Sequence, residues 1–477
     1  MSDSPSPAPK LSTSLNVKLS TMMFLQYAIW GAWLPFLWSF LSGSRGMDGD
    51  QIGNMFAIGA VGAIIGPLVA GTLADRYVST EKLLAFSHVV GALLIWQLAT
   101  IESYWGFLTF AGLYGLIYMP TLPLTNSLSF HHIKDIDRDF GRVRVWGTVG
   151  WIAVGLAMGH WLLSRHTPTD GVLESAQATL AAALAEGRAA AAVAAQAAVD
   201  AAQKLVEAKQ AAGKADAFRL SALLGVVMGV YCLFLPHTPP ARDAESNPAL
   251  KSLSAVKAQP LLTLFLLAVP VSCIHQFYFV HTETFLGKQQ IAAPEWSKAI
   301  FGAGGGGLMT VGQMTEVLVL AAIPFVAKST SRKALLATGL VAYAARMALF
   351  AYFDSIPLPT MATLLIGIGL HGLCFGCFIF VAFMVVDEET SADVRASAQN
   401  LFNLVIVGVG VIVGSKIAGW VADWAATIPT GQFDEHGEEQ LDIVYRDLFA
   451  VPMYAAIACL LLLLAFYRGG RHESSTA

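Results

Sequence analysis

Charged residues are scarce in this chain, because Asp, Glu, Lys and Arg make up only 13% of its 477 residues. A soluble globular domain carries about a quarter charged residues, whereas 55% of this sequence is hydrophobic. The formal net charge of −4 provides no basic field for binding nucleic acid. The composition therefore disfavours a soluble domain and a nucleic-acid-binding protein, and it favours a protein embedded in a lipid bilayer.

Cysteine is also sparse, and the residues present all fall in apolar stretches. Cys374 and Cys377 have the spacing of a redox or zinc motif, but no second ligand pair accompanies them, so we interpret them as helix-packing residues. The histidines show no metal-ligand spacing. The glycine-rich segment 302–307 lacks the Lys-Ser/Thr pair of a phosphate-binding loop. The sequence therefore predicts no metal, no cofactor and no enzyme active site.

Apolar stretches long enough to cross a bilayer, which takes about 20 residues, recur along the whole chain. They lie at approximately 18–42, 50–74, 81–100, 104–129, 141–164, 218–236, 259–286, 303–327, 333–353, 357–386, 393–423 and 445–467. A polar connection divides them into two equal groups. The sequence therefore predicts an all-α membrane protein with twelve transmembrane helices in two six-helix bundles.

Polar segments flank and separate the two groups of spans. The tail at 1–17 is rich in Ser and Pro, shows no evident cleavable signal peptide, and is expected to be disordered. We expect the N-terminal bundle at 18–236 and the C-terminal bundle at 259–467. The linker between them at 237–258 is rich in Pro and charge, and a short tail at 468–477 ends the chain.

Lysine and arginine in the short loops predict the orientation of the chain. With the N-terminus inside, most of these residues fall on one side of the membrane. The short loops on the other side hold only Arg45, Lys288, Lys298 and Arg446. Both termini and the central linker are therefore predicted to lie in the cytoplasm.

One predicted outer connection, residues 166–217, is unusually long. It is rich in Ala with scattered Glu, Lys and Gln, a composition that favours helix but is too polar to span a membrane. Gly187 and Gly213 are suited to punctuate a helical hairpin outside the bilayer. We expect an inert periplasmic insertion, with a partner-binding or signalling element as the alternative.

The loop after the second predicted span carries GTLADR, from Gly71 to Arg76. This string resembles the G-x-x-x-D-R loop signature of the major facilitator superfamily. The resemblance implies that Asp75 and Arg76 cap helices and gate the inner side of a transporter, while a plain solvated loop is the alternative.

Longer strings resemble one branch of that superfamily, the bacterial nucleoside permeases, which are nucleoside:proton symporters. These strings are FLQYAIWGAWL (24–34), YMPTLPLTNSLS (118–129), RVWGTVGW (144–151), LPH (235–237), ARMALFAY (345–352) and RASAQ (395–399). They occur in order on the expected helices. The resemblance implies a monomeric carrier of the bacterial inner membrane that imports nucleosides with protons by alternating access.

Arg144 lies inside an apolar segment, where a charge costs roughly 2.5–3.5 kcal/mol at the bilayer centre. Thr148 and Trp151 follow at i+4 and i+7, so the three residues share one helical face. Arg144 could instead extend toward the cytoplasm, a behaviour known for long basic side chains. The resemblance implies that Arg144 and Thr148 line a central cavity and bind substrate.

Glu316 lies about fourteen residues into the eighth predicted span, on the order of 20 Å from its outer end and therefore near mid-membrane. A carboxylate there must be paired, hydrated or protonated, because burial favours the neutral form. Gln313 lies one turn earlier on the same face. The resemblance assigns both residues to the substrate site, and a structural buried hydrogen bond is the alternative. We predict that Arg144 and Glu316 face one cavity from opposite bundles.

Other candidates rest on weaker signals. Gln26 and Trp30 share a face of the first span, where they are suited to hold a base or sugar or simply to pack helices. The resemblance implies substrate binding by Gln276 and Phe375. His371 shares a face with Phe375 and stands where family members can carry tyrosine.

The chain departs from the family pattern at two positions. Phe279 stands where the pattern has asparagine, and Gly376 stands where it has aspartate. One hydrogen-bonding and one ionisable side chain are therefore missing. Glu316 becomes the best remaining proton carrier, with His371 as the second. These departures keep open a proton-coupled carrier of sugars or another polar solute. A non-transporting membrane sensor that signals through the Ala-rich insertion is the other alternative.

Overall fold

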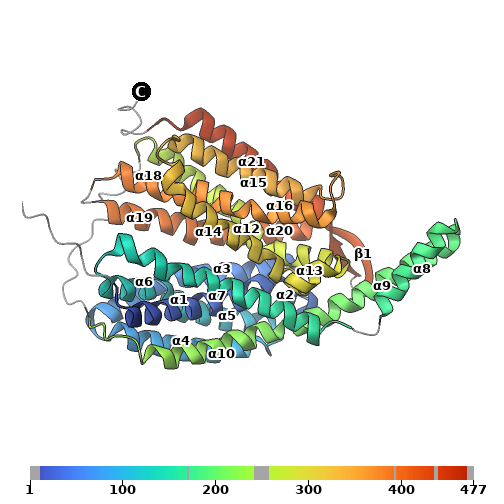
Figure 1. The fold of residues 1–477 in the computed structure, drawn as a ribbon, viewed down its shortest axis with the longest axis horizontal. Coiled ribbons are helices and arrows are strands. Elements are labelled where there is room, and N and C mark those ends of the chain that lie inside the picture. The colour runs from blue at the N-terminus through green and yellow to red at the C-terminus, as the bar shows by residue number, and fades with distance from the viewer. Residues whose placement is uncertain (1–10, 169–170, 241–256, 392–393, 434–438, 470–477) are drawn as a thin grey trace, which may run out of the picture.

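The structure is a computed structural model that describes residues 11–168, 171–240, 257–391, 394–433 and 439–469. Within these ranges the chain is almost entirely helical, with one short two-stranded sheet (Figure 1). Ten of the described helical segments are long and apolar enough to cross a membrane. The prediction of a helical membrane protein is therefore confirmed.

The N-terminal half, residues 11–240, forms the lower layer of Figure 1, and its long helices run along the longest axis of the molecule. Its elements are α1 (Thr13–Trp33), η1 (Leu34–Phe36), α2 (Leu37–Arg45), α3 (Gly49–Arg76), α4 (Thr80–Leu98), α5 (Tyr104–Tyr118), α6 (Thr121–His132), α7 (Ile136–Arg165), α8 (Val172–Ala185), α9 (Ala189–Gly213) and α10 (Ala215–Cys232). The turn η1 joins α1 and α2 without a loop, so the two form one long helical segment.

The C-terminal half, residues 257–469, forms the upper layer of Figure 1. Its elements are α12 (Leu261–Ile291), α13 (Glu295–Phe301), α14 (Gly306–Val326), α15 (Arg332–Ala351), α16 (Thr360–Gly369), α17 (His371–Leu373), η2 (Cys374–Phe380), α18 (Val381–Glu389), α19 (Arg395–Asn403), η3 (Leu404–Val409), α20 (Gly410–Ala425), β1 (Ala426–Phe433), β2 (Glu439–Ile443) and α21 (Tyr445–Phe466). The stretches η2 and η3 are π-helical, a conformation that often marks functional sites.

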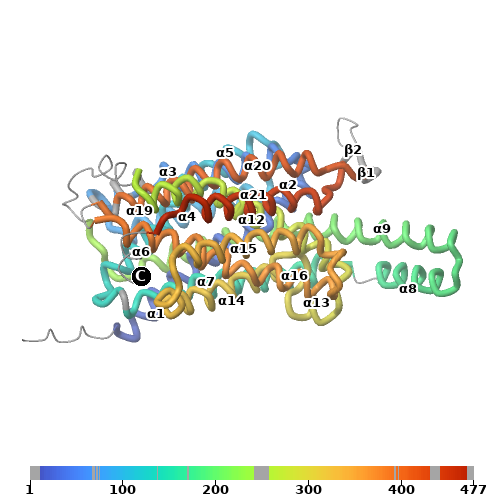
Figure 2. The backbone as a smooth tube through the Cα atoms, turned by 90° about the horizontal axis from the view of Figure 1, so that it is seen from above, coloured from blue at the N-terminus to red at the C-terminus, as the bar shows by residue number. Residues whose placement is uncertain are grey.

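The two ends of the molecule differ. The start of α1 and the end of α21 lie at one end, called the terminal end below (Figure 1). The helices α8 and α9 project from the opposite end, called the insertion end, where α13 and the β-hairpin also lie (Figures 1 and 2).

Capping residues explain where several helices begin. The Ser12 side chain accepts a hydrogen bond from the backbone of Leu15, so α1 begins at Thr13, before the predicted span start at residue 18. Asp48 and Gln51 form a reciprocal capping box at the start of α3. Local polar residues therefore extend helices beyond the apolar stretches from which the spans were predicted.

The predicted Ala-rich connection forms α8 and α9, which pack against each other. Gly187 has a left-handed backbone (φ 67°) and makes the turn between them, as its position predicts. Gly213 makes no turn, because α9 continues through Lys214 into α10 with helical backbone angles. A Cβ on Gly213 would lie 2.4 Å from the His166 ring, so close packing explains this glycine.

The glycine-rich segment 302–307 carries the chain from α13 into α14. Gly302 adopts φ 74° and passes so close to α7 that an added Cβ would lie 2.1 Å from the backbone of Gly159. The backbone N–H of Ala303 donates to the Gly159 carbonyl at 2.8 Å. This segment therefore joins the two halves through backbone contact that a side chain would prevent.

A β-hairpin interrupts the otherwise helical architecture between α20 and α21. β1 and β2 pair antiparallel, with Ala426 opposite Ile443 and Ile428 opposite Asp442. The sequence predicted an all-α protein, so these strands are a departure from that prediction, and β1 contains Pro429. Proline is tolerated at sheet edges, and a two-stranded sheet consists only of edges.

The helices α1 and α7 pack at very short range through glycine. A Cβ on Gly150 would lie 2.2 Å from the carbonyl oxygen of Phe24. A Cβ on Gly31 would lie 2.7 Å from the Trp151 ring. This packing fixes the face of α7 that carries Arg144 against α1.

We expect Gly150→Ala to lower the free energy of unfolding by about 1–3 kcal/mol, because the new methyl group forces the two helices apart. Gly141→Ala on the same helix is the matched control, since nothing lies within 4 Å of its added Cβ. The melting temperatures of the detergent-purified variants check this expectation. Equal melting temperatures for the two variants would contradict the proposed close contact.

Candidate functional site

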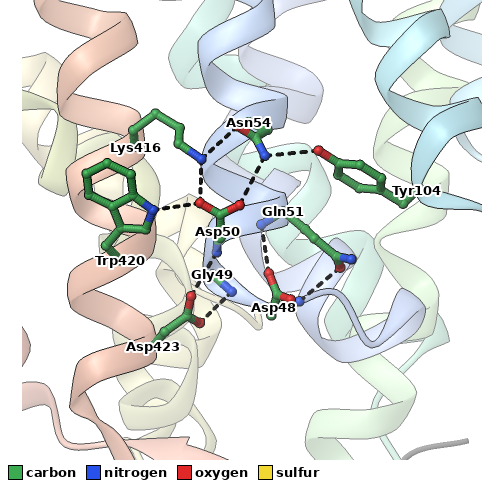
Figure 3. Close-up of polar contacts among 9 residues, drawn as sticks. All are labelled: Asp48, Gly49, Asp50, Gln51, Asn54, Tyr104, Lys416, Trp420 and Asp423. Atoms are coloured by element: carbon green, nitrogen blue, oxygen red, sulfur yellow. Dashed lines mark hydrogen bonds and ion pairs between the residues drawn. The ribbon is translucent and has the colours of Figure 1, made fainter. Parts of the chain in front are cut away.

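The two halves meet at the insertion end through the first turn of α3. The Asp423 carboxylate of α20 accepts hydrogen bonds from the backbone N–H groups of Gly49 (2.6 Å) and Asp50 (2.9 Å) (Figure 3). Free N–H groups at a helix N-terminus favour a negative charge, so Asp423 caps a helix of the opposite half.

Lys416 lies about two helical turns before Asp423 on α20 and strengthens the same junction. Its ammonium group pairs with the Asp50 carboxylate and donates to the Asn54 side chain at 2.8 Å (Figure 3). The Trp420 indole N–H also donates to Asp50, at 2.6 Å. These residues, with Gly49 and Asp423, are called the α3–α20 cluster below.

A second polar junction at the insertion end surrounds Glu283 of α12, whose side chain is fully buried. It pairs with Lys214 at 3.2 Å and accepts a hydrogen bond from the Ser39 hydroxyl, both from the N-terminal half. Its other oxygen accepts from the Gly305 backbone N–H at 3.1 Å. The Glu283 cluster and the α3–α20 cluster together hold the halves against each other at this end.

Arg144 and its neighbours lie on the N-terminal side of the region between the halves. The Arg144 guanidinium stacks over the Tyr27 ring of α1 at 4.0 Å and is half-buried, whereas Arg142 is exposed. The rings of Trp30 and Trp151 meet edge to face at 5.6 Å. The structure therefore brings together Arg144, Trp151 and Trp30 on the paired helices α1 and α7. Thr148, also half-buried, lies on α7 between Arg144 and Trp151.

Gln26 has a different environment from Trp30, although both lie on α1. Its side-chain amide donates to the Thr121 hydroxyl at 2.7 Å, and its side-chain oxygen contacts the His88 ring at 3.0 Å. The residue is fully buried. Gln26 therefore ties α1 to α4 and α6 in this conformation, and its assignment to the substrate site stays a prediction.

Glu316 lies at the midpoint of the 21-residue helix α14, ten residues from either end. Its carboxylate lies 3.4 Å from Nε2 of His371. His371 is the ionisable residue in contact with it in the described structure, and Arg144 acts on it electrostatically across the interface. Gln313, one turn earlier on α14, is buried, and so is Gln276 on α12. The structure thus places Glu316 next to His371, the second predicted proton carrier.

Arg346 on α15 is a residue of this region that the sequence analysis did not single out. Its side chain is fully buried, and its Nη1 lies 2.9 Å from Nδ1 of His371. The guanidinium also stacks over the rings of Tyr278 (4.4 Å) and Tyr343 (5.2 Å). A charge inside an apolar span drew attention to Arg144, and the same signal was present at Arg346.

His275 of α12 completes an aromatic group around His371. The two imidazole rings stack with centroids 5.5 Å apart, and the Tyr343 hydroxyl lies 2.6 Å from Nδ1 of His275. Phe375 and Phe279 flank the pair, with ring centroids 6.3 Å and 5.2 Å from His275. His371 and Phe375, predicted to share a face, therefore both lie in this aromatic group.

A sequence profile described as the nucleoside H+ symporter family matches residues 13–187 and 192–471. The chain belongs to the nucleoside H+ symporter family. The resemblance to nucleoside permeases is thereby confirmed. The matched proteins are transporters and not enzymes, and the chain is a multi-pass membrane protein.

Individual relatives agree with this family. The putative nucleoside transporter YegT of Escherichia coli (strain K12) is 32% identical over 85% of this chain and 84% of that protein. The nucleoside permease NupG of the same organism is 25% identical, over 86% of this chain and 88% of that protein. The crystal structure of the nucleoside transporter NupG has a TM-score of 0.73 at 22% identity, covering 96% of this chain and all of that one. At this identity the structural likeness establishes the fold alone.

The packing around Gly376 explains how the chain accommodates its departure from the pattern expected for this family. Gly376 lies in the π-helical stretch η2, where an added Cβ would stand 2.6 Å from a methyl carbon of Val319 on α14. An aspartate would require α14 or Val319 to move. The helix that carries Glu316 therefore occupies space that a side chain at position 376 would need.

The predicted gating residues lie where α3 ends, at the terminal end of the molecule. Arg76 is the last residue of that helix and is exposed, while the side chain of Asp75 lies outside the described part of the structure. Their assignment to a gate of the transporter stays a prediction.

A cavity of about 310 Å³ lies outside this site, between the insertion and the C-terminal half. Its lining includes Leu173, Val206 and Gln210 from the insertion side and Gln290, Glu295 and Lys298 from α12 and α13. None of the predicted substrate-binding residues lines it. The cavity therefore belongs to the insertion end and not to the region around Arg144 and Glu316.

We expect Glu283→Gln to lower the free energy of unfolding by about 3–5 kcal/mol, because it leaves Lys214 buried without a counter-charge. The double change Lys214→Met with Glu283→Gln should recover most of this loss. Melting temperatures in detergent check the cycle. Glu295→Gln is the control, since that carboxylate side chain is 87% exposed and its pair with Lys298 is worth little. A Glu283→Gln variant as stable as the parent would mean that the pair adds nothing.

Proposed function

We propose that this chain is a secondary carrier that imports nucleosides together with protons by alternating access. The observation that carries the proposal is the position of Glu316. A carboxylate at the midpoint of an apolar helix contacts His371 and lies within the electrostatic reach of Arg144 on the opposite half. In a member of the nucleoside H+ symporter family, such a group is suited to bind a proton during transport.

We infer a twelve-span architecture from the helical segments. The continuous α1–α2 segment and α3 add two spans to the ten that meet the length and composition criteria. Six spans would then lie in each half, as the predicted bundles 18–236 and 259–467 require. With the basic loops inside, the terminal end faces the cytoplasm of a bacterial cell and the insertion end faces the periplasm.

The proposed substrate lies between the halves. Directional hydrogen bonds to its ribose or base come from both halves, and aromatic rings stack against the base. The proposed polar contacts are Arg144, Thr148, Gln276, Gln313 and Glu316, and the proposed aromatic contacts are Trp30, Trp151 and Phe375.

Alternating access requires the two junctions at the insertion end to separate when the carrier opens outward. The α3–α20 cluster and the Glu283 cluster close that end in the present conformation. Their partners come from opposite halves, so a rocking motion of the halves would break both together. We assign Asp75 and Arg76 to the corresponding gate at the terminal end.

Uptake into proteoliposomes tests the function directly. We expect radiolabelled nucleoside to accumulate when the lumen is made alkaline relative to the outside, and to equilibrate without accumulation when no gradient is imposed. Unlabelled nucleosides should compete, whereas sugars should not. Competition by sugars alone would favour a carrier for another polar solute, and binding without flux would identify a sensor.

Glu316→Gln should abolish accumulation driven by the pH gradient while retaining nucleoside counterflow exchange. Glutamine preserves the size and hydrogen bonding of the side chain but cannot bind and release a proton. Accumulation and counterflow are measured on the same proteoliposome preparation, so that counterflow reports intact folding. Undiminished accumulation in Glu316→Gln would refute this role of the carboxylate.

Arg144→Lys should reduce nucleoside uptake about tenfold or more, because lysine retains the charge but lacks the planar fork of donors and the flat surface that stacks on Tyr27. Arg142→Lys is the matched control, since Arg142 is exposed two residues earlier on α7. Both variants are compared at equal amounts of reconstituted protein. Parental uptake by Arg144→Lys would mean that Arg144 serves only the helix interface.

A further inference from the structure

Arg346 is a fully buried positive charge for which the substrate-binding assignments give no role. Guanidinium does not lose its proton under biological conditions, so the charge is permanent and must be compensated. Its contacts in the described structure are with neutral groups: Nδ1 of His371 and the faces of Tyr278 and Tyr343. Its Nε and Nη2 atoms are buried without a hydrogen-bond partner in the described structure.

His371 links Arg346 to an acidic side chain, that of Glu316. Nη1 of Arg346 lies 2.9 Å from one ring nitrogen of His371, and the Glu316 carboxylate lies 3.4 Å from the other. The rings of Tyr278 and Tyr343 lie against the Arg346 guanidinium, and the Tyr278 ring also stacks on His371 with centroids 4.5 Å apart. An arginine, an imidazole and a carboxylate therefore form a line across α15, α17 and α14.

The positions of Arg346 and Glu316 on opposite sides of the His371 ring determine which ring nitrogen carries the proton. Arginine only donates hydrogen bonds, so Nδ1 of His371 must accept and cannot carry a proton. The single ring proton of neutral His371 then lies on Nε2, the ring nitrogen that is 3.4 Å from the Glu316 carboxylate. A second proton on His371 would place two donors against each other, 2.9 Å apart.

We propose that Arg346 is a positioning residue for proton coupling: it keeps His371 as a neutral Nε2–H donor and thereby makes Glu316 the group that takes up and releases the transported proton. This inference rests on the proposed proton-coupled import. The proton arrives on the Glu316 carboxylate from the outside, leaves it toward the cytoplasm, and does not pass onto His371.

Several other groups surround this line and contribute to its electrostatics. Those facing Glu316, His371 or Arg346 from the packed elements are Arg144, His275, Tyr278, Tyr343 and Cys374, in addition to Arg346 itself. Of these, only the two arginines carry a permanent charge. We expect removal of the Arg346 charge to favour the protonated form of Glu316, because a nearby positive charge stabilises a carboxylate.

The first experiment compares Arg346→Met with the matched surface change Arg446→Met, in which an exposed arginine is lost. Uptake and counterflow are measured as a function of external pH. We expect Arg346→Met to shift the half-maximal pH of uptake by about one unit toward alkaline. Counterflow should persist, while the initial rate of gradient-driven uptake falls by up to about tenfold, because a shift of one pH unit changes the ratio of protonated to ionised carboxylate tenfold. Arg446→Met should follow the parent.

The second experiment separates positioning from proton carriage and does not depend on the folding of Arg346→Met. Glutamine at position 371 can accept from Arg346 through its oxygen and donate to Glu316 through its nitrogen, yet it cannot titrate. We expect His371→Gln to keep the parental pH profile and accumulation, and His371→Leu to show the alkaline shift.

The outcomes distinguish this inference from the proposed function. A parent protein that fails to exchange nucleosides would refute the proposed function itself. If the parent exchanges and accumulates, an unshifted pH profile in both Arg346→Met and His371→Leu would overturn the role of Arg346. Loss of accumulation in His371→Gln with counterflow intact would identify His371 as a proton carrier and overturn the inference.

Discussion

Charges inside a membrane must be held by partners that come from other helices, and this constraint organises the central region of the protein. Two arginines of the described helices, one in each half, lie over tyrosine rings: Arg144 over Tyr27, and Arg346 over Tyr278 and Tyr343. Aromatic faces stabilise a cation without neutralising it. Glu316 lies between these two positive groups: Arg144 acts on it electrostatically from the opposite half, and His371, which contacts it, also contacts Arg346.

The packing around this region combines rigid helix pairs with separable junctions. Within the N-terminal half, Gly150 allows α7 to lie directly on the backbone of α1, so these helices move together. Between the halves, the polar junctions use side chains that water can solvate once they part, such as Asp50 and Lys416. Hydrogen bonds exchanged for water cost little net free energy. The fold therefore permits motion between halves while preserving the arrangement within each half.

The sequence predicted those features that produce strong local signals. Long apolar runs located the spans, and charges inside such runs identified Arg144 and Glu316. The sequence could not predict contacts between distant segments. Nothing in the periodicity of α12 or α15 indicates that Glu283 contacts Lys214, or that Arg346 contacts His371. Gln26 illustrates the same limit: its helical face is periodic with Trp30, yet its partners His88 and Thr121 come from other helices.

Because α9 continues into α10 through Lys214, a movement of α10 is transmitted to the Ala-rich insertion. Residues Ala189–Cys232 form one helical segment of 44 residues, about 66 Å long, of which α9 projects beyond the bundle (Figure 2). A small rotation at the base of this segment therefore produces a larger displacement at its tip. A tilt of about 10° about Lys214 would displace the far end of the 25-residue helix α9 by about 6 Å. A spectroscopic label near Ala189 would consequently report the transport cycle from a site remote from both substrate and protons.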